Sequence, residues 1–260
     1  MKHTKTLSIL CWNVNGIRAV QKKGFIEWVQ KESPDILCLQ ETKANAGQLD
    51  DALKNIDGYT SYFHSAQRKG YSGVAIYTKI APNAVREGFG DPKFDNEGRV
   101  ISMDFDAFTL FNIYFPNGGR GTDRLNYKLD FYDDILVHWE KLRKSGKKLI
   151  ICGDVNTAHK EIDVAKPEAW SDDSGFLPEE REWIDKIVDM GYVDTFREFN
   201  DKPGQYTFWD PISRARIRNE GWRIDYFFVT QDLMPHVRNA TILPDVMGSD
   251  HCPIGLELEL

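Results

Sequence analysis

The sequence Ile9-Leu10-Cys11-Trp12-Asn13-Val14-Asn15 is echoed by Ile150-Ile151-Cys152-Gly153-Asp154-Val155-Asn156. Each segment begins with an apolar run typical of a buried strand and ends in two polar residues separated by valine. Because side chains alternate along a strand, both polar residues of a segment are expected on the same face. The echo indicates a weak internal duplication. It favours an α/β sandwich of four layers, in which two packed mixed β-sheets are flanked by helices and both strand ends lie at one rim.

Short apolar segments alternate with longer amphipathic segments along the chain. Strands are predicted over residues 6–12, 35–40, 59–64, 73–78, 99–105, 109–115, 148–153, 225–230, 237–242 and 253–259. Helices are predicted over residues 17–31, 46–55, 122–145 and 178–190. No linker, low-complexity tract or change in composition divides the sequence, so we expect one catalytic domain over residues 1–260.

The ends and apolar faces of three of these helices can also be predicted. Thr122 is expected as an N-cap and Gly146 as a C-cap residue, Pro178 in a first turn, and Ser33-Pro34 as the end of the first helix. The apolar face of the third helix is expected to consist of Leu125, Leu129, Tyr132, Leu136, Trp139 and Leu142. That of the fourth is expected to consist of Trp183, Ile184, Ile187 and Val188.

Composition limits the class of protein. No apolar run approaches the length of a membrane span, so no membrane association is expected. Cys11, Cys38, Cys152 and Cys252 lie within or beside apolar runs without zinc spacing, which predicts buried thiols in a reducing, cytoplasmic compartment. The net charge of −7 by itself argues against nucleic acid. A nuclease that holds a divalent cation nevertheless concentrates carboxylates at its centre.

Polar residues stand repeatedly at the ends of predicted strands. They are Asn13 and Asn15, Glu41, Asp154 and Asn156, Asp225, and the pair Asp250-His251. A single such residue is usually a turn or a helix cap. Together, however, they combine carboxylates, carboxamides and a histidine. Hard oxygen ligands suit Mg²⁺. The set therefore predicts attack of water on a phosphate ester, with a metal and a histidine stabilising the developing charge.

These residues fall within blocks that resemble the exonuclease III-like apurinic/apyrimidinic (AP) endonucleases of the endonuclease/exonuclease/phosphatase superfamily. The resemblance runs from about Leu7 to the C-terminus. Its blocks are Trp12-Asn13-Val14-Asn15-Gly16-Ile17-Arg18-Ala19, Leu39-Gln40-Glu41-Thr42-Lys43, Gly70-Tyr71-Ser72-Gly73-Val74-Ala75, Tyr114-Phe115-Pro116-Asn117-Gly118, Gly153-Asp154-Val155-Asn156-Thr157-Ala158-His159, Gly221-Trp222-Arg223-Ile224-Asp225-Tyr226 and Gly248-Ser249-Asp250-His251-Cys252-Pro253.

The resemblance implies a role for each residue of the site. The principal metal ligand would be Glu41, assisted by Asn13, Asn15 and Asp250. Many relatives carry aspartate at the position of Asn15. Catalytic residues would be Asp154 at the attacking water with Asn156 beside it, His251 at the scissile phosphate, Asp225 orienting its ring, and Tyr114 donating its hydroxyl. The cofactor implied is Mg²⁺, with Mn²⁺ as a substitute. The activity implied is cleavage 5′ to an abasic site in double-stranded DNA by a monomer.

Residues 206–225 interleave basic and aromatic residues and are the expected recognition region. The resemblance implies a small apolar pocket that accepts a flipped sugar without its base, lined by Phe208, Trp222 and Ile224. Further DNA contacts are expected from Asn117, Arg120 and Arg18. Other candidates for phosphate contacts are Lys22, Lys23, Arg68, Lys69, Arg214, Arg216, Arg218 and Arg223. The sequence of this region differs from the family pattern around Asp210-Pro211-Ile212-Ser213.

Two alternatives remain open. A phosphatase of inositol lipids or a sphingomyelinase would share the same catalytic core, and the Gly221–Asp225 block and Arg18-Ala19 favour DNA repair over these. A DNA-binding scaffold with an inactive site would have lost a key residue, and none is missing. The balance among AP endonuclease, 3′→5′ exonuclease and 3′-end trimming activities, and the number of metal ions, are not fixed by the sequence.

Overall fold

The structure is a computed structural model that describes residues 6–119 and 121–260. Its first sheet has six strands in the order β11-β12-β1-β2-β4-β3. These strands are β1 (Thr6–Asn13), β2 (Ile36–Gln40), β3 (Thr60–His64), β4 (Val74–Thr78), β11 (Val237–Ile242) and β12 (Ile254–Glu259). The second sheet has six strands in the order β5-β6-β7-β8-β10-β9. These are β5 (Ala84–Glu87), β6 (Val100–Asp104), β7 (Thr109–Tyr114), β8 (Leu149–Asp154), β9 (Tyr192–Asp194) and β10 (Asp225–Thr230).

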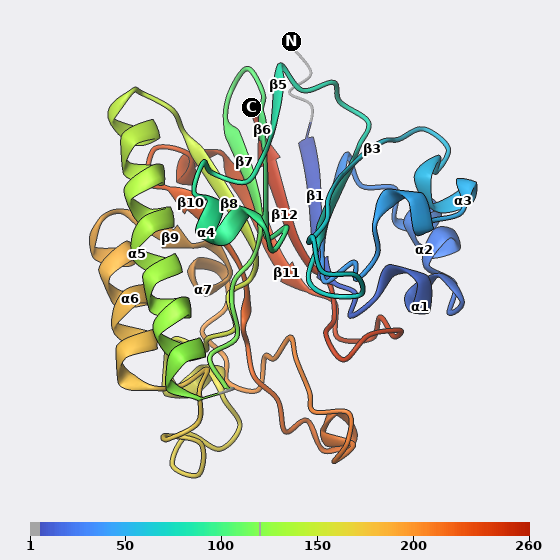
Figure 1. Ribbon diagram of the computed structural model, residues 1–260. Coiled ribbons are helices and arrows are strands. Elements are labelled where there is room, and N and C mark those ends of the chain that lie inside the picture. The colour runs from blue at the N-terminus through green and yellow to red at the C-terminus, as the bar shows by residue number, and fades with distance from the viewer. Residues whose placement is uncertain (1–5, 120) are drawn as a thin grey trace.

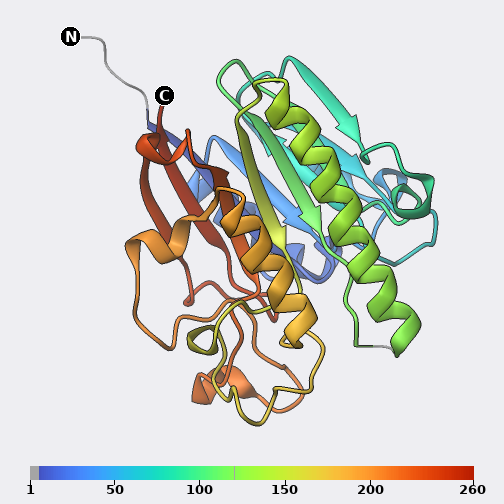
Figure 2. The same cartoon turned by 90° about the vertical axis from the view of Figure 1, so that its left-hand side faces the viewer.

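Helices cover the outer face of each sheet (Figures 1 and 2). Those on the first sheet are α1 (Ile17–Gln21), α2 (Phe25–Glu32) and α3 (Asp51–Lys54), and those on the second are α5 (Thr122–Lys144) and α6 (Pro178–Asp189). The remaining helical elements are α4 (Pro92–Asp95), α7 (Thr195–Phe199) and four 3₁₀ turns, η1 (Ala46–Gln48), η2 (Glu161–Asp163), η3 (Ala215–Arg218) and η4 (Met234–His236).

Three large apolar cores fill the spaces between these layers. The inner faces of both sheets meet in one core, which contains Ile9 and Ile36 of the first sheet and Ile150 and Phe227 of the second. A second core joins the second sheet to α5 and α6, and a third joins the first sheet to α1–α3. The predicted fold of two mixed sheets between helical layers is therefore confirmed.

All ten predicted strands are present, and the structure adds the short edge strands β5 and β9. The helix predicted over 17–31 is broken at Gly24, whose φ of 89° is left-handed, and that predicted over 46–55 divides into η1 and α3. The predicted helix end at Ser33-Pro34 is confirmed, since Ser33 caps α2. All four cysteines are free and buried, as predicted.

Details of α5 and α6 correct the expected caps and faces. Gly121 caps α5, and Thr122 is its first residue instead of its N-cap. The buried face of α5 is shifted, because Lys128, Phe131 and Ile135 are buried while Leu125, Leu129 and Leu142 are only partly covered. Val188 of α6 is 38% exposed and does not belong to its apolar face. Among the described residues, none of the helices combines the length and hydropathy that a bilayer crossing requires.

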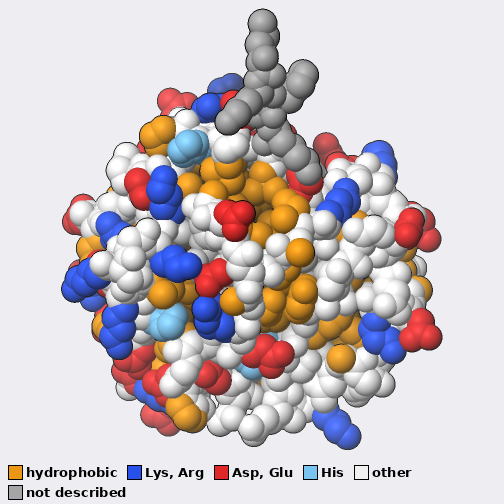
Figure 3. Space-filling model, turned by 90° about the horizontal axis from the view of Figure 1, so that it is seen from above, with side chains coloured by type: hydrophobic (Ala, Val, Ile, Leu, Met, Phe, Trp, Pro, Cys, Tyr) orange, Lys and Arg blue, Asp and Glu red, His pale blue; other side chains and the backbone are white. Residues whose placement is uncertain are grey.

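The strand directions bring the predicted site residues to one end of the sandwich. β1 runs parallel to β2, and β7 runs parallel to β8, so that both pairs end at the same rim. In the second sheet Asp154 lies opposite Tyr114 on one side and opposite Asp225 on the other. The other end of the molecule shows hydrophobic side chains in the middle of the face, with charges of both signs around them (Figure 3).

Gly153 allows β8 to approach β7 closely enough to place Asp154 at this rim. Its φ is +145°, and a Cβ built at this position would lie 1.8 Å from the carbonyl oxygen of Ile113. Since that obstacle is backbone of the paired strand, it cannot move aside as a flexible side chain would. The close approach of the two strands therefore requires glycine.

We expect Gly153→Ala to lower the free energy of unfolding by at least about 2 kcal/mol, because backbone strain and overpacking both contribute. Urea denaturation followed by circular dichroism measures the change. Gly47→Ala is the matched control, since nothing lies within 4 Å of its added Cβ. Equal stabilities of the two variants would contradict the requirement for glycine at position 153.

Candidate active site

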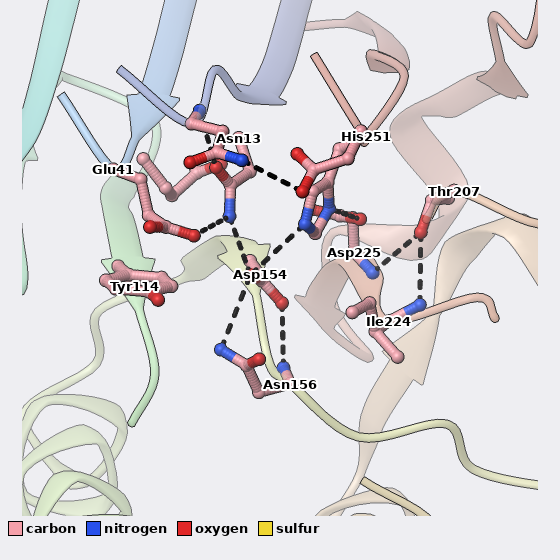
Figure 4. A network of polar contacts seen from close by, with 12 residues as sticks. Asn13, Glu41, Tyr114, Asp154, Asn156, Thr207, Ile224, Asp225 and His251 are labelled. Atoms are coloured by element: carbon pink, nitrogen blue, oxygen red, sulfur yellow. Dashed lines mark hydrogen bonds and ion pairs between the residues drawn. The ribbon is translucent and has the colours of Figure 1, made fainter. Parts of the chain in front are cut away.

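The side chain of Asn13 joins the two sheets at this rim. It is fully buried at the end of β1, and its amide nitrogen donates to Glu41 Oε1 at 2.9 Å and to Asp154 Oδ2 at 2.8 Å (Figure 4). Glu41 follows β2 of the first sheet, whereas Asp154 ends β8 of the second. One carboxamide therefore holds two carboxylates from different sheets facing each other.

Asp154 is further fixed by the residues that follow it. Its Oδ1 accepts the backbone N–H of Asn156 at 2.8 Å. The side chain of Asn156 donates to the carbonyl of Phe115 at 2.9 Å, and its oxygen accepts from Asn117 at 3.0 Å. This chain of contacts links the end of β8 to the segment after β7. Asn156, predicted as a catalytic residue, and Asn117, predicted as a DNA contact, are therefore hydrogen-bonded to each other next to Asp154.

His251 approaches the same carboxylate from the opposite side. Its Nδ1 lies 2.8 Å from Asp225 Oδ2, and its Nε2 lies 3.9 Å from Asp154 Oδ2 (Figure 4). All three side chains are buried. A carboxylate on Nδ1 fixes the ring orientation and directs Nε2 toward the cluster. The predicted Asp225–His251 pair is therefore present in the structure.

The cluster strongly perturbs the acidities of its members. Burial raises the pKa of Asp154 to about 7, with the neighbouring carboxylates of Asp225 and Glu41 acting in the same direction against the opposing charge of His251. Burial alone would lower the pKa of His251, but Asp225 and Asp154 raise it to about 10. Burial also raises the pKa of Tyr114 well above its ordinary value, so its hydroxyl keeps its proton. The site thus holds an imidazolium, a phenol donor and a carboxyl able to exchange a proton near neutral pH.

Glu41, Asp154 and His251 converge on one point, where the two carboxylates can face a cation. Their ligand atoms lie within 4.8 Å of one another. Two carboxylates held this close repel each other unless a positive charge lies between or beside them. In the structure Lys43 supplies part of that charge, since its ammonium lies 2.7 Å from Glu41 Oε2. The donor set and its excess of negative charge fit a divalent cation bound by oxygen.

The other predicted ligands are engaged with one another. Asn15 donates through its amide nitrogen to Asp250 Oδ2 at 2.9 Å, and its oxygen accepts from Lys43. The oxygen of Asn13 accepts the backbone N–H of Asn15 at 3.0 Å. Asn13 therefore presents its nitrogen to the carboxylates. The ligand roles of Asn13, Asn15 and Asp250 stay predictions.

Three residues of the site have a left-handed backbone. Asn15, Glu41 and Asn156 have φ values of 45°, 52° and 55°. Each directly follows a strand or stands two residues beyond one. The chain therefore turns out of the extended conformation at the second polar residue of each segment. The side chains of Asp154 and Asn156 nevertheless lie on the same side, with Asn156 Nδ2 3.4 Å from Asp154 Oδ2. Strained backbone of this kind is concentrated at functional sites.

An apolar wall adjoins His251. It is formed by Phe208, Trp222 and Ile224, which pack in one cluster with Phe176 and Val164. Phe208 makes β-bridges to both Trp222 and His251, and the rings of Phe208 and His251 are 4.9 Å apart. The three residues predicted to line the pocket are thus brought together, next to the catalytic cluster.

Two of the four arginines in the recognition region, Arg216 and Arg223, are less available than expected, whereas Arg214 and Arg218 are exposed. Arg223 is buried against Asp163 and Asp194, at distances of 2.7 Å to each, so its proposed contact with phosphate is wrong. Arg216 donates to carbonyls of the 244–249 loop and lies over the ring of Trp209.

Other predicted DNA contacts are exposed around the site. Arg18 is exposed on α1, in a surface hollow that also includes Lys22 and Lys43. Asn117 is exposed as well. Arg120 lies outside the described residues.

Two residues that support the site were missed by the sequence analysis. The Thr207 hydroxyl accepts the backbone N–H groups of Ile224 and Asp225 at 3.1 and 3.2 Å, which fixes the start of β10. Trp170 stacks on Trp222, with ring centroids 4.8 Å apart and planes inclined by 18°. Trp170 lies in a segment without periodicity, and nothing in its local sequence connects it to residue 222.

Comparison with known proteins agrees with this geometry. Residues 10–251 match the Endonuclease/Exonuclease/phosphatase family. The chain is 44% identical to a DNA-(apurinic or apyrimidinic site) endonuclease of Dictyostelium discoideum, over 98% of this chain and 71% of that protein. It is 41% identical to an exodeoxyribonuclease of Bacillus subtilis, over 98% of this chain and 100% of that protein.

Among solved structures, the AP endonuclease LMAP of Leishmania major superposes with a TM-score of 0.89 at 31% identity, covering 100% of this chain and 90% of the other. The likeness therefore extends over both sheets and all the strand ends that carry the site. The chain belongs to the Endonuclease/Exonuclease/phosphatase family, within its branch of exonuclease III-like AP endonucleases.

Proposed function

We propose that this nuclease hydrolyses the phosphodiester bond on the 5′ side of an abasic site in double-stranded DNA. Cleavage leaves a 3′-hydroxyl and a 5′-deoxyribose phosphate. One observation carries the proposal: a cluster of carboxylates and histidine from both sheets lies directly beside an apolar wall. We also propose accessory 3′→5′ exonuclease and 3′-end trimming activities, and the name of one relative, exodeoxyribonuclease, supports the exonuclease activity.

The cation that we propose for the site is Mg²⁺, with Mn²⁺ as a substitute. Glu41 would be its principal ligand, assisted by Asn13, Asn15 and Asp250, and Asn13 also holds the carboxylates of Glu41 and Asp154 in place. When bound, the ion would supply positive charge to a phosphate oxygen. The donor set supports this choice, because magnesium needs few protein carboxylates and retains its own waters.

The chain's own residues account for the remaining parts of hydrolysis. Asp154 is placed to orient the attacking water and accept its proton, because burial brings its pKa to about 7. The imidazolium of His251, held by Asp225, would stabilise the charge that develops on the phosphate. Tyr114 would donate its hydroxyl to the phosphate, and Asn156 would assist Asp154 at the attacking water.

Recognition of the lesion is proposed to depend on shape. In this proposal a sugar without its base packs against the apolar wall of Phe208, Trp222 and Ile224, and a complete nucleotide is excluded by its size. Extrusion also costs least where no base has to be unstacked and unpaired. We further propose that the whole chain acts as one catalytic unit and as a monomer, on DNA in the bacterial cytoplasm or in a nucleus.

A panel of duplexes tests this function directly. Each duplex carries an abasic site, a nick, a 3′-phosphate or a uracil, and each is assayed with and without Mg²⁺. The proposal expects strong metal-dependent cleavage 5′ to the abasic site. Turnover of phosphoinositides in place of abasic DNA would indicate a lipid phosphatase, and binding of DNA without product would indicate an inactive scaffold.

We expect Asp154→Asn to lower kcat by roughly 10²–10⁴-fold, because the amide cannot accept the proton of water. The variant should bind abasic duplex within a few-fold of the wild-type affinity, since shape and hydrogen-bonding donors around it are retained. Single-turnover cleavage and fluorescence anisotropy measure the two effects. Exposed Asp57→Asn serves as a control, and near-wild-type turnover of Asp154→Asn would refute the assigned role.

We expect Trp222→Ala to weaken the preference for abasic over intact nucleotides by about three- to tenfold, in proportion to the lost aromatic contacts. The ratio of kcat/KM for abasic cleavage to that for exonuclease digestion measures this preference. The Mg²⁺ concentration that gives the half-maximal rate should be the same in Trp222→Ala as in the wild type. Trp28→Ala, on α2, is the control and should keep the wild-type preference for abasic nucleotides. An equal loss of Mg²⁺ affinity would count against the pocket.

A further inference from the structure

Arg99, which directly precedes β6, is one of the largest charged side chains in the interior, with 2% of its surface exposed. Its guanidinium donates in three directions. Nη1 donates to the carbonyl of Tyr114 at 2.9 Å, Nη2 to the hydroxyl of Tyr71 at 2.8 Å, and Nε to Glu97 Oε2 at 2.6 Å. No step of the proposed hydrolysis uses this residue, although it touches the backbone of one that does.

We infer that Arg99 is a positioning residue for Tyr114, which sets the phenol at the point where the phosphate is bound. This inference rests on the proposed function. Arg99 holds Tyr114 at three places: the N–H of Tyr114 donates to the Arg99 carbonyl at 2.9 Å, the guanidinium binds the Tyr114 carbonyl, and it lies 4.8 Å from the centre of the phenol ring. Backbone and ring are thus fixed by a single side chain.

Charge supports the same assignment. Tyr114 lies beside the carboxylates of Glu41 and Asp154, and the guanidinium of Arg99 places a positive charge 4.8 Å from the centre of its ring. A planar fork with several donors in fixed directions is a property of arginine that lysine lacks. The orientation of Tyr114 therefore depends on the shape of the guanidinium as well as its charge.

Arg124 of α5 provides a matched control. It donates to the same partners, with Nη2 2.8 Å from the Tyr71 hydroxyl and 2.9 Å from Glu97 Oε2. Its other ring contact is with Tyr127, at 4.3 Å. Loss of Arg124 therefore disturbs the Glu97–Tyr71 network from the side away from Tyr114.

A double-mutant cycle tests the inference. Arg99→Gln and Arg124→Gln are each made in the wild type and in Tyr114→Phe, and single-turnover cleavage of abasic duplex is measured at saturating enzyme. Arg99→Gln is expected to slow cleavage about tenfold when Tyr114 is present and less than about threefold in the Tyr114→Phe background. Arg124→Gln should have the same fold-effect in both backgrounds. An equal effect of Arg99→Gln in the two backgrounds would overturn the inference.

A second readout is independent of cleavage. With 3-fluorotyrosine at position 114, the ¹⁹F resonance should shift or broaden in Arg99→Gln and stay unchanged in Arg124→Gln. Arg99→Lys should restore less than half of the lost rate, since the ammonium lacks the fork. If Arg99→Gln fails to fold, both measurements are made with Glu97→Gln instead. That variant removes the carboxylate that orients Arg99. An unchanged resonance rejects the role of Arg99, whereas failure of the wild type to cut abasic DNA rejects the proposed function.

Discussion

The amide of Asn13 between Glu41 and Asp154 is the contact on which the site depends. Its two hydrogen bonds are the point where the first sheet meets the second at the rim. Around it lie further charged groups, Asp225 and His251, in a region from which water is largely excluded. Burying several carboxylates together is costly, and the arrangement persists because each one has a donor or an opposite charge beside it. Folding therefore meets the cost of desolvating these charges before any ligand arrives. The cluster is then already arranged to bind a metal cation and a phosphate.

A second buried network supports the first from the outside. The ammonium of Lys128, which is fully buried on α5, donates to Glu180 at 2.6 Å, to the carbonyl of Asn156 at 2.7 Å and to the Thr157 hydroxyl at 2.7 Å. Glu180 in turn accepts backbone N–H groups of Gly175 and Leu177. This ion pair therefore anchors both ends of the segment that carries Trp170. The helical layer thereby holds the strand end that bears Asp154 and Asn156.

The sequence predicts the strands and their polar ends because both signals are local, whereas the convergence of those ends is predicted from the echo of two strand ends and from the family resemblance. An apolar run followed by Asp154 or Glu41 needs no knowledge of distant residues. The features that the sequence does not predict are those that depend on tertiary contacts. The sequence predicts Lys128 on the polar face of an amphipathic helix. In the structure it is buried, because it forms an ion pair with Glu180 of α6. Trp170 is assigned to a loop, and its stack on Trp222 arises from how that loop folds back. Left-handed turns at non-glycine residues such as Glu41 likewise have no local signature.

The order of strands in the first sheet has a consequence for biosynthesis. Thr6 pairs with Glu259, so β1 forms its antiparallel ladder with β12, a strand that is synthesised long after it. Contacts between such distant segments slow folding and leave an unpaired strand edge exposed while the chain is incomplete. The segment directly before β12 also delivers His251. Completion of the first sheet and completion of the catalytic cluster therefore depend on the same late-synthesised part of the chain, and the edge of β1 has no antiparallel partner until that part is made.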